Sequence, residues 1–401
     1  MSSATGSRLG TVLRSEDRVT PLELFFDLVF VLALTQCTAL MASDPTWQGL
    51  VRGLLVLGVL WWSWVAYAWL TSVVDPEEGV VRLTIFAAMG ALLVVALTVP
   101  EAFDESALLF ACAYGGVRVA QIVLFEIASR DDPGLRHSIN GLAISTGIGV
   151  SLLVAASFTD GALQGALWAL ALALDMGGPL LIDSSGWRLM PEHFAERHGL
   201  ILIIALGESI VAIGVGAEGI DVDAGVVVAA LLGVAAAAAL WWLYFDVVAL
   251  VAERRLSNAE PGREQNEVAR DSYSYLHFPM VAGIVLLALG LKKTIEHVDD
   301  PLKIEPAVAM LGGTAIYLLA HVAFRWRNVR RLSRQRVLAA LVLIALVPAG
   351  VELPALATLA IVVAVLAAVI AYERTRFAEL RARLRHQLVA EQPPSPANVP
   401  D

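Results

Sequence analysis

The sequence is poor in charge and almost without cysteine. Only 16% of its 401 residues are charged, whereas about a quarter are charged in an average soluble domain. The two cysteines, Cys37 and Cys112, both fall inside apolar runs. We therefore expect two free, packed thiols, with neither a disulfide framework nor a zinc site. These scarcities argue against a soluble globular domain.

Several functional motifs are also absent. The sequence has no Walker A loop, no dinucleotide-binding glycine fingerprint, no H-E-x-x-H and no nucleophile elbow. We expect no ATP-driven work, no metal, no cofactor and no nucleic-acid partner. The first 21 residues are polar and lack the apolar core of a cleavable signal peptide.

Long apolar runs, broken by short polar segments, make up most of the chain. Hydrophobic residues are 58% of the sequence, and runs of about 17–25 apolar residues are typical of transmembrane helices. The sequence predicts an all-α integral membrane protein whose main partner is the lipid bilayer. We count twelve spans, at 22–41, 50–72, 82–99, 106–128, 138–158, 162–182, 198–216, 224–251, 272–291, 306–324, 337–350 and 353–372.

The basic residues indicate the orientation. With the N-terminus inside, the inside segments hold 23 of the 28 basic residues, and Arg52 and Arg118 lie within spans. The outside loops hold only Lys292, Lys293 and Lys303. Because cytoplasmic loops carry an excess of Lys and Arg, we expect both termini in the cytoplasm and a multi-pass protein of the bacterial plasma membrane.

Matches in consistent order predict an internal repeat. Two parallel six-helix halves, 22–187 and 188–372, would be related by an axis along the membrane normal. Cytoplasmic tails would cover 1–21 and 373–401, the latter basic and amphipathic and then Pro-rich. The matching residues are Glu23 with Glu196, Trp61-Trp62 with Trp241-Trp242, and Gly115-Gly116 with Gly312-Gly313.

The segment Glu192–Gly216 carries polar groups inside an apolar helix. Ten residues separate His198 from Glu208, which is roughly 15 Å, or half a bilayer core. If His198 lies near one interface, Glu208 and its neighbour Ser209 lie near the midplane. A carboxylate there costs at least a few kcal/mol unless it is paired, protonated or faces water.

The first span carries two carboxylates on one helix face. Glu23 and Asp27 are four residues apart and would repel each other unless a proton or a positive group lies between them. One interpretation is a proton or cation site. The other is a buried polar clamp, in which Glu23 caps the helix and Asp27 bonds a neighbouring Arg or Trp.

Two further charges lie deep in the first half. Arg118 is predicted to pair with Asp27, Asp175 or Glu208, and the alternative is that it snorkels to an interface. Asp175 is followed by Gly177-Gly178-Pro179, which predicts a broken helix beside an acid, as in many ion sites. The alternative is a helix end with Asp175 near the surface.

The remaining candidates lie among aromatic residues. Asp246 follows an aromatic run in the eighth span and is expected to point inward, and His277 precedes Pro279 and could relay protons or serve only as a hydrogen-bonded polar group. In the second span we favour an interface belt over a stacked aromatic wall. Its aromatic residues are Trp61, Trp62, Trp64, Tyr67 and Trp69.

Two segments resemble the bacterial low temperature requirement A family. The first is Pro21–Val31, continuing to Thr35-Gln36, and the second is Glu196–Gly199 with Ala205–Val211. The resemblance implies an integral membrane protein but supplies no reaction. Span one also resembles, more weakly, the Phe-Ser-Asp signature of a potassium channel family built from six-helix units, with Phe26 in place of the Ser.

Three functions fit these features. The first is a transporter or channel for a small solute or ion that uses buried carboxylates. The second is an intramembrane enzyme that acts on a lipid or isoprenoid by acid chemistry. The third is a structural or sensory membrane protein whose buried charges fix helix register. The sequence leaves open whether the chain forms a homo-oligomer.

Overall fold

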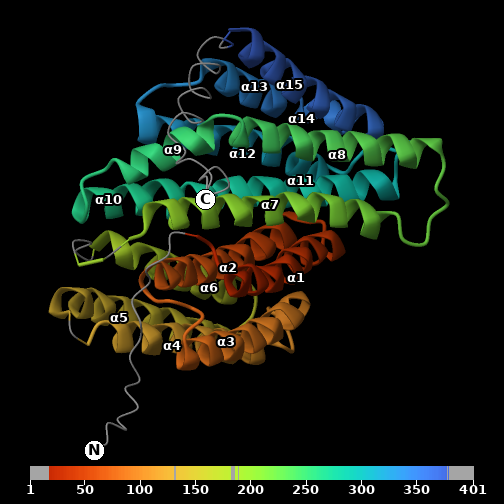
Figure 1. The fold of residues 1–401 in the computed structure, drawn as a ribbon. Coiled ribbons are helices and arrows are strands. Elements are labelled where there is room, and N and C mark those ends of the chain that lie inside the picture. The colour runs from red at the N-terminus through yellow and green to blue at the C-terminus, as the bar shows by residue number, and fades with distance from the viewer. Residues whose placement is uncertain (1–17, 131, 182–185, 188, 377, 379–401) are drawn as a thin grey trace, which may run out of the picture.

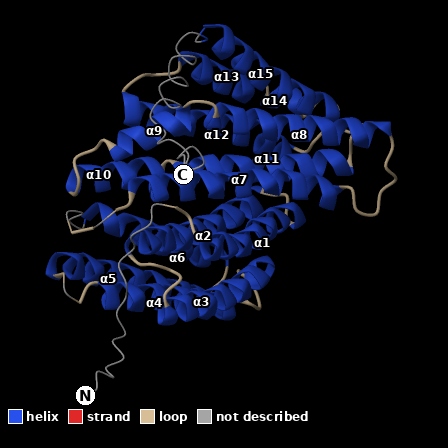
Figure 2. Cartoon of the chain, viewed as in Figure 1, coloured by secondary structure: helices blue, strands red, loops and turns tan. Residues whose placement is uncertain are grey.

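The computed structural model describes residues 18–130, 132–181, 186–187, 189–376 and 378. Helices account for the regular structure of these residues (Figure 2), apart from isolated bridge positions at Val74, Pro301 and Pro354. The elements are α1 (Pro21–Ser43), α2 (Trp47–Val73), α3 (Gly79–Thr98), η1 (Val99–Glu101), α4 (Ala107–Ala128), α5 (Pro133–Ala156), α6 (Gly161–Leu181), α7 (Pro191–Gly216), α8 (Ala224–Phe245), α9 (Val248–Ser257), α10 (Arg263–Val268), the π-helical η2 (Ala269–Tyr275), α11 (His277–Glu296), α12 (Ile304–Val329), α13 (Arg334–Ala345), α14 (Val347–Gly350) and α15 (Ala355–Arg376).

Ten helical segments are long and apolar enough to cross a membrane. Of the twelve expected spans, the sixth and the eleventh are not among the ten. Helix α6 has 21 residues but carries Gln164 and Asp175, whereas α13 has only 12 residues and is followed by the four-residue α14. The fold is therefore that of a multi-span α-helical membrane protein.

Apolar side chains cover the outward faces of many helices. Leu83 on α3, Ile144 on α5 and Leu338 on α13 are all more than 60% exposed. In water these side chains would cost free energy in proportion to their area, but lipid accepts them. The exposed surface therefore agrees with the membrane assignment.

The helices lie side by side along one common direction, in layers (Figure 1). Helices α1–α6 form one part of the stack and α7–α15 the other, and α1 and α2 contact α7 and α11 where the two parts meet. Helices α1 and α7 run in the same direction. Their hydrogen bonds join Glu23 to His193, Asp27 to Arg197 and Thr35 to Glu208, at offsets of 170, 170 and 173 residues. We call this contact the α1–α7 seam.

Helices α11 and α12 are packed backbone to backbone through glycine. A Cβ atom on Gly283 would lie 2.5 Å from the Gly313 carbonyl oxygen, and a Cβ on Gly313 would lie 2.6 Å from Cβ of Leu286. Small residues allow such close approach of membrane helices, whose association depends on van der Waals packing. This pair forms the rigid centre of the second half.

Two irregular segments interrupt the expected spans. The eighth span breaks at Asp246 and Val247 into α8 and α9. The ninth contains the π-helical η2, in which the Leu276 amide donates to the Asp271 carbonyl five residues back. Pro279 lies in the first turn of α11, just beyond this widened segment. It therefore sits where its missing amide is least needed.

The glycine contact gives a matched pair of substitutions. Gly313→Ala is expected to lower the free energy of unfolding by about 1–3 kcal/mol, because the new methyl group overlaps Leu286. Gly312→Ala is the control, since its Cβ would meet only Val308 at 3.6 Å, and alanine favours the helix. Thermal unfolding of the two purified variants in detergent compares them. Equal unfolding midpoints would show that the α11–α12 contact is not tight.

Candidate functional site

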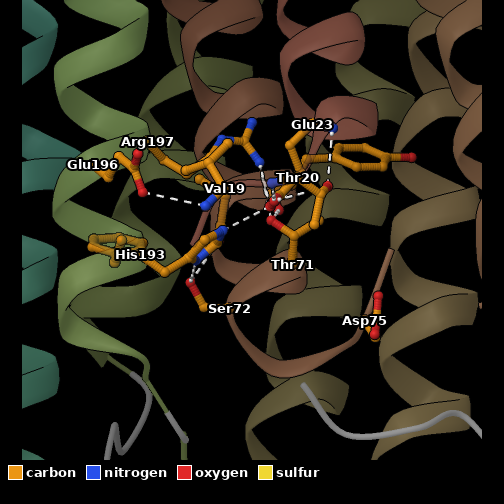
Figure 3. A network of polar contacts seen from close by, with 12 residues as sticks. Val19, Thr20, Glu23, Thr71, Ser72, Asp75, His193, Glu196 and Arg197 are labelled. Atoms are coloured by element: carbon orange, nitrogen blue, oxygen red, sulfur yellow. Dashed lines mark hydrogen bonds and ion pairs between the residues drawn. The ribbon is translucent and has the colours of Figure 1, made fainter. Parts of the chain in front are cut away.

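Arg197 lies at the centre of a buried charge network on the α1–α7 seam (Figure 3). Its Nη1 donates to Glu23 Oε1 and to the Thr71 hydroxyl, both at 3.0 Å, and its Nη2 donates to Asp27 Oδ1 at 2.7 Å. The arginine and both carboxylates are 0–1% exposed. The carboxylate pair on α1 is therefore bridged by a cation from α7, which is the polar clamp interpretation with its partner now identified.

Glu23 has both oxygens occupied. Thr20 and Glu23 form a capping box at the start of α1, in which the Thr20 amide donates to Glu23 Oε2 at 2.9 Å. The other oxygen lies 2.8 Å from His193 Nε2, and His193 Nδ1 contacts the Ser72 hydroxyl at 3.3 Å (Figure 3). Glu23 thus caps the start of α1 and also joins α1 to α7.

Asp27 is only partly satisfied. Its Oδ1 accepts bonds from Arg197 and from Trp64 Nε1, the latter at 2.8 Å, whereas its buried Oδ2 makes no hydrogen bond within the described residues. The Arg197 guanidinium also lies over the Trp64 ring, 5.5 Å from its centroid, a cation–π contact. If His193 carries a proton, the two acids and the two bases of this network balance in charge.

The tryptophans of the second span form a buried wall, and the interface-belt prediction is wrong. Trp61, Trp62 and Trp64 are 0–4% exposed. The indoles of Trp61 and Trp69 both donate to Ser274 of η2, at 2.8 Å to its carbonyl and 2.9 Å to its hydroxyl. Two indoles of this aromatic wall thus hydrogen-bond to the π-helical segment, where the regular α-helical hydrogen-bond pattern is interrupted.

Arg118 pairs with Asp175, one of the three predicted partners. Arg118 Nη2 lies 2.9 Å from Asp175 Oδ1, and Thr146 donates to the same oxygen at 2.9 Å. Tyr114 donates to Asp175 Oδ2 at 3.1 Å. Three helices of the first half, α4, α5 and α6, are joined at this point. The carboxylate is saturated and the pair is buried, which is a structural rather than a reactive arrangement.

Both expectations for the Asp175 segment are wrong. Helix α6 continues through Gly177, Gly178 and Pro179 to Leu181, and Asp175 is only 4% exposed. Side chains of the second half bond carbonyls of this last turn. Arg270 donates to the Pro179 carbonyl at 3.3 Å, and Tyr275 donates to that of Met176. These bonds join the end of α6 to η2 of the second half.

Glu208 differs from the other buried acids. It is 1% exposed, and the Thr35 hydroxyl donates to its Oε2 at 2.5 Å. Within the described residues it makes no ion pair. The neighbouring Ser209 hydroxyl is buried and makes no hydrogen bond there either. Helix α7 begins at Pro191, seven residues before His198, so Glu208 lies 17 residues from its start and 8 from its end.

His198 and His277 lie together in an aromatic core beside the seam. Their ring centroids are 5.3 Å apart, and His198 also packs on Trp64 at 4.9 Å. Tyr244 contacts His277 Nε2 at 2.8 Å, and Nδ1 of this histidine lies 3.0 Å from the Ser272 carbonyl. Both His277 nitrogens are occupied, whereas His198 Nε2 is buried without a hydrogen bond in the part that the structure describes.

Asp246 lies apart from the other candidates. It caps α8 at the break before α9 and lines a cavity of about 320 Å³. A smaller cavity of about 70 Å³ lies where Arg118 and Trp62 of the first half meet Ser274 of the second. Among the described residues, no group of three or more His, Cys, Asp or Glu side chains is placed to hold a metal.

Sequence reasoning missed three residues of the site. His193 lies in no distinguishing pattern, whereas Thr35 and Arg197 belong to the two segments that resemble the family, a resemblance that gives neither residue a role. A usable signal exists for Arg197, because a buried carboxylate pair requires a cation and this arginine lies in the first two turns of α7. No comparable signal marks a single threonine hydroxyl.

Removing Arg197 should leave the two buried carboxylates, Glu23 and Asp27, without this cation. Arg197→Gln is expected to lower the free energy of unfolding by about 3–5 kcal/mol. Arg82→Gln, at an exposed pair with Glu77, is the control and should change it by at most about 1 kcal/mol. Chemical unfolding in mixed micelles measures both. A loss below about 1 kcal/mol for the Arg197 variant would contradict the central role of this arginine.

The Arg118–Asp175 pair is suited to a double-mutant cycle. Arg118→Met and Asp175→Asn should each destabilise the protein, because each leaves one buried charge unpaired. The double variant should be less destabilised than the sum of the two by at least about 1 kcal/mol. Additive losses would mean that the two charges do not stabilise each other.

The chain is similar in sequence to a curated protein and to a family of bacterial proteins. A curated relative, an uncharacterized protein of Rhizobium meliloti (strain 1021), is 30% identical over 306 residues, which is 74% of each chain. No solved structure matches the chain. The model of the family described as bacterial low temperature requirement A protein matches residues 18–371. The chain therefore belongs to the bacterial low temperature requirement A family.

Proposed function

We propose that the protein is a transporter or channel for a small ion or solute, with Glu208 as a proton or cation site between two six-helix halves. The observation that carries this proposal is the setting of Glu208, a buried carboxyl that accepts a hydrogen bond from the Thr35 hydroxyl and makes no ion pair within the described residues. A carboxyl at such depth must take a proton or a cation to be stable. Binding and releasing that charge is what an ion pathway requires.

The contacts between helices support twelve crossings. Helices α1 and α7 run in the same direction, so the chain must cross the membrane an even number of times between their starts. Helices α1–α5 supply five crossings, and α6 supplies the sixth. The α13–α14 segment runs beside α12 in the opposite direction. Arg336, at the start of α13, contacts His321 near the end of α12. Gly350, at the end of α14, lies against Leu311 near the start of α12.

A repeat of six helices is supported by similar neighbours in each half. Helices α4, α5 and α6 follow one another in contact, as α12, α13 and α15 do. In each half a tyrosine hydrogen bond joins the second helix and the fourth, with the tyrosine on the second helix in one half and on the fourth in the other. Tyr67 of α2 donates to the Val117 carbonyl at 2.9 Å, and Tyr317 of α12 donates to the Leu240 carbonyl of α8 at 2.8 Å. Transporters built from repeats place their sites where the repeats meet.

The proposed orientation has both termini on the cytoplasmic side of the plasma membrane. The start of α1 and the end of α15 then lie at the same end of the bundle, together with the basic loops. The α1–α7 seam would contain two groups of polar residues. Asp27 lies near the cytoplasmic end, and Thr35 and Glu208 lie closer to the opposite end. Eight residues separate Asp27 from Thr35, which is about 12 Å. A rocking motion of the halves about the Asp27 end would open the seam beside Thr35 and Glu208.

Glu208→Gln tests the proposal in proteoliposomes. We expect proton, Na⁺ or K⁺ flux driven by an ion gradient to fall at least about tenfold, because a neutral amide cannot exchange a proton or hold a cation. Thermal unfolding should be unchanged or slightly improved, since the buried acid is removed. Glu218→Gln, an exposed carboxyl just after α7, should retain full flux.

Two results would overturn the assignment of Glu208 to an ion pathway. One is wild-type flux at the level of empty liposomes for all three ions. The other is normal flux in the Glu208→Gln protein, which would leave the buried charges only the role of fixing helix register.

A further inference from the structure

A cavity lies among α8, α9, α12, α13 and α15 of the second half. It has a volume of about 320 Å³ and is formed where α8 breaks into α9, beside the ends of α12 and α15. Its lining includes the apolar residues Val248, Val251 and Ile370 and the three arginines Arg325, Arg331 and Arg336. A volume near 300 Å³ is enough for a small ligand or for one end of a larger one.

The arginines of this cavity are not equally engaged. Arg336 is bound by Glu373 through two parallel hydrogen bonds of 2.8 Å, and it also contacts His321. Arg325 donates to the Ser333 hydroxyl at 2.8 Å, and within the described residues neither Arg325 nor Arg331 makes an ion pair. With Glu373 taken by Arg336, these two guanidinium groups face a single further carboxylate, Asp246. The cavity lining therefore keeps a positive charge.

Exposed tryptophans mark the depth of the cavity in the membrane. Trp326, next to Arg325, is 47% exposed, and Trp241, next to the cavity residue Trp242, is 43% exposed. Partly exposed tryptophan is typical of the level of the lipid headgroups. Three features thus coincide: apolar lining residues, positively charged lining residues and the headgroup level.

We propose that this cavity binds the headgroup of an anionic phospholipid of the inner leaflet. The phosphate would lie between Arg325 and Arg331, as guanidinium groups favour phosphate oxygens. The first carbons of the acyl chains would follow Val248 and Val251. Basic cavities between helices on the cytoplasmic side are suited to such headgroups. The lipid site depends on the proposed orientation but does not depend on Glu208. A result that disproves the lipid site therefore does not disprove the ion pathway, and the reverse also holds.

Lipid titration of the purified protein tests the site. Dioctanoyl phosphatidylglycerol, dioctanoyl phosphatidylcholine and inorganic phosphate are added separately, and Trp fluorescence is followed, because Trp242 lines the cavity. We expect phosphatidylglycerol to bind at least about tenfold tighter than phosphatidylcholine. Free phosphate should bind more weakly still, because it makes no contact with the apolar lining residues.

Two variants locate the binding. The double substitution Arg325→Gln with Arg331→Gln should weaken phosphatidylglycerol binding at least about tenfold, and Val248→Trp should weaken it by filling the cavity. Arg334→Gln is the control, an exposed arginine of α13 outside the cavity lining. Unchanged phosphatidylglycerol affinity in both variants would overturn the proposal. So would free phosphate that binds as tightly as the lipid, which would indicate a site for a soluble anion.

Discussion

The ion pairs of Arg197 with Glu23 and Asp27 determine how the two parts of the bundle fit together. A buried guanidinium and two buried carboxylates are costly unless each meets its partner, and such pairs contribute more to register than to net stability. Glu23 and Asp27 are one helical turn apart on α1, and Arg197 donates to both. If α1 slid by one helical turn relative to α7, at least one of these charges would be left buried without its partner. The register that avoids this also places Thr35 opposite Glu208.

Much of the architecture could be predicted, because it depends on local composition. Apolar runs predict helices wherever their length suits a bilayer, and each of the twelve expected spans overlaps described helical structure, although the eighth and the eleventh each contain a break. The spacing of Glu23 and Asp27 placed them on one face, and the depth of Arg118 required an acid. Which acid it meets depends on which helices are neighbours, and that information is absent from local sequence. Gly177-Gly178-Pro179 was predicted to break a helix, but Arg270 and Tyr275 of the other half bond carbonyls of that turn.

The three buried acid sites differ in how well their charge is balanced. Asp175 has an arginine, a threonine and a tyrosine, and Glu23 has an arginine, a histidine and its own helix cap. Glu208 receives a hydroxyl hydrogen bond from Thr35 and makes no ion pair within the described chain. An acid with a permanent cation has no need of a mobile one, so the first two suit structural roles. The same reasoning singles out Glu208 as the site at which a mobile charge would be bound.

The α1–α7 seam is therefore uneven along its length. At the Glu23 end it is held by charge-assisted bonds that also engage Thr71 and Trp64 of α2, and at the Glu208 end by the bond from Thr35. Separating the helices at the first end would expose several unpaired charges, each costing a few kcal/mol. Separating them at the second would break a much smaller set of polar contacts. For the proposed transport function, the halves would pivot about Arg197 and open first beside Glu208.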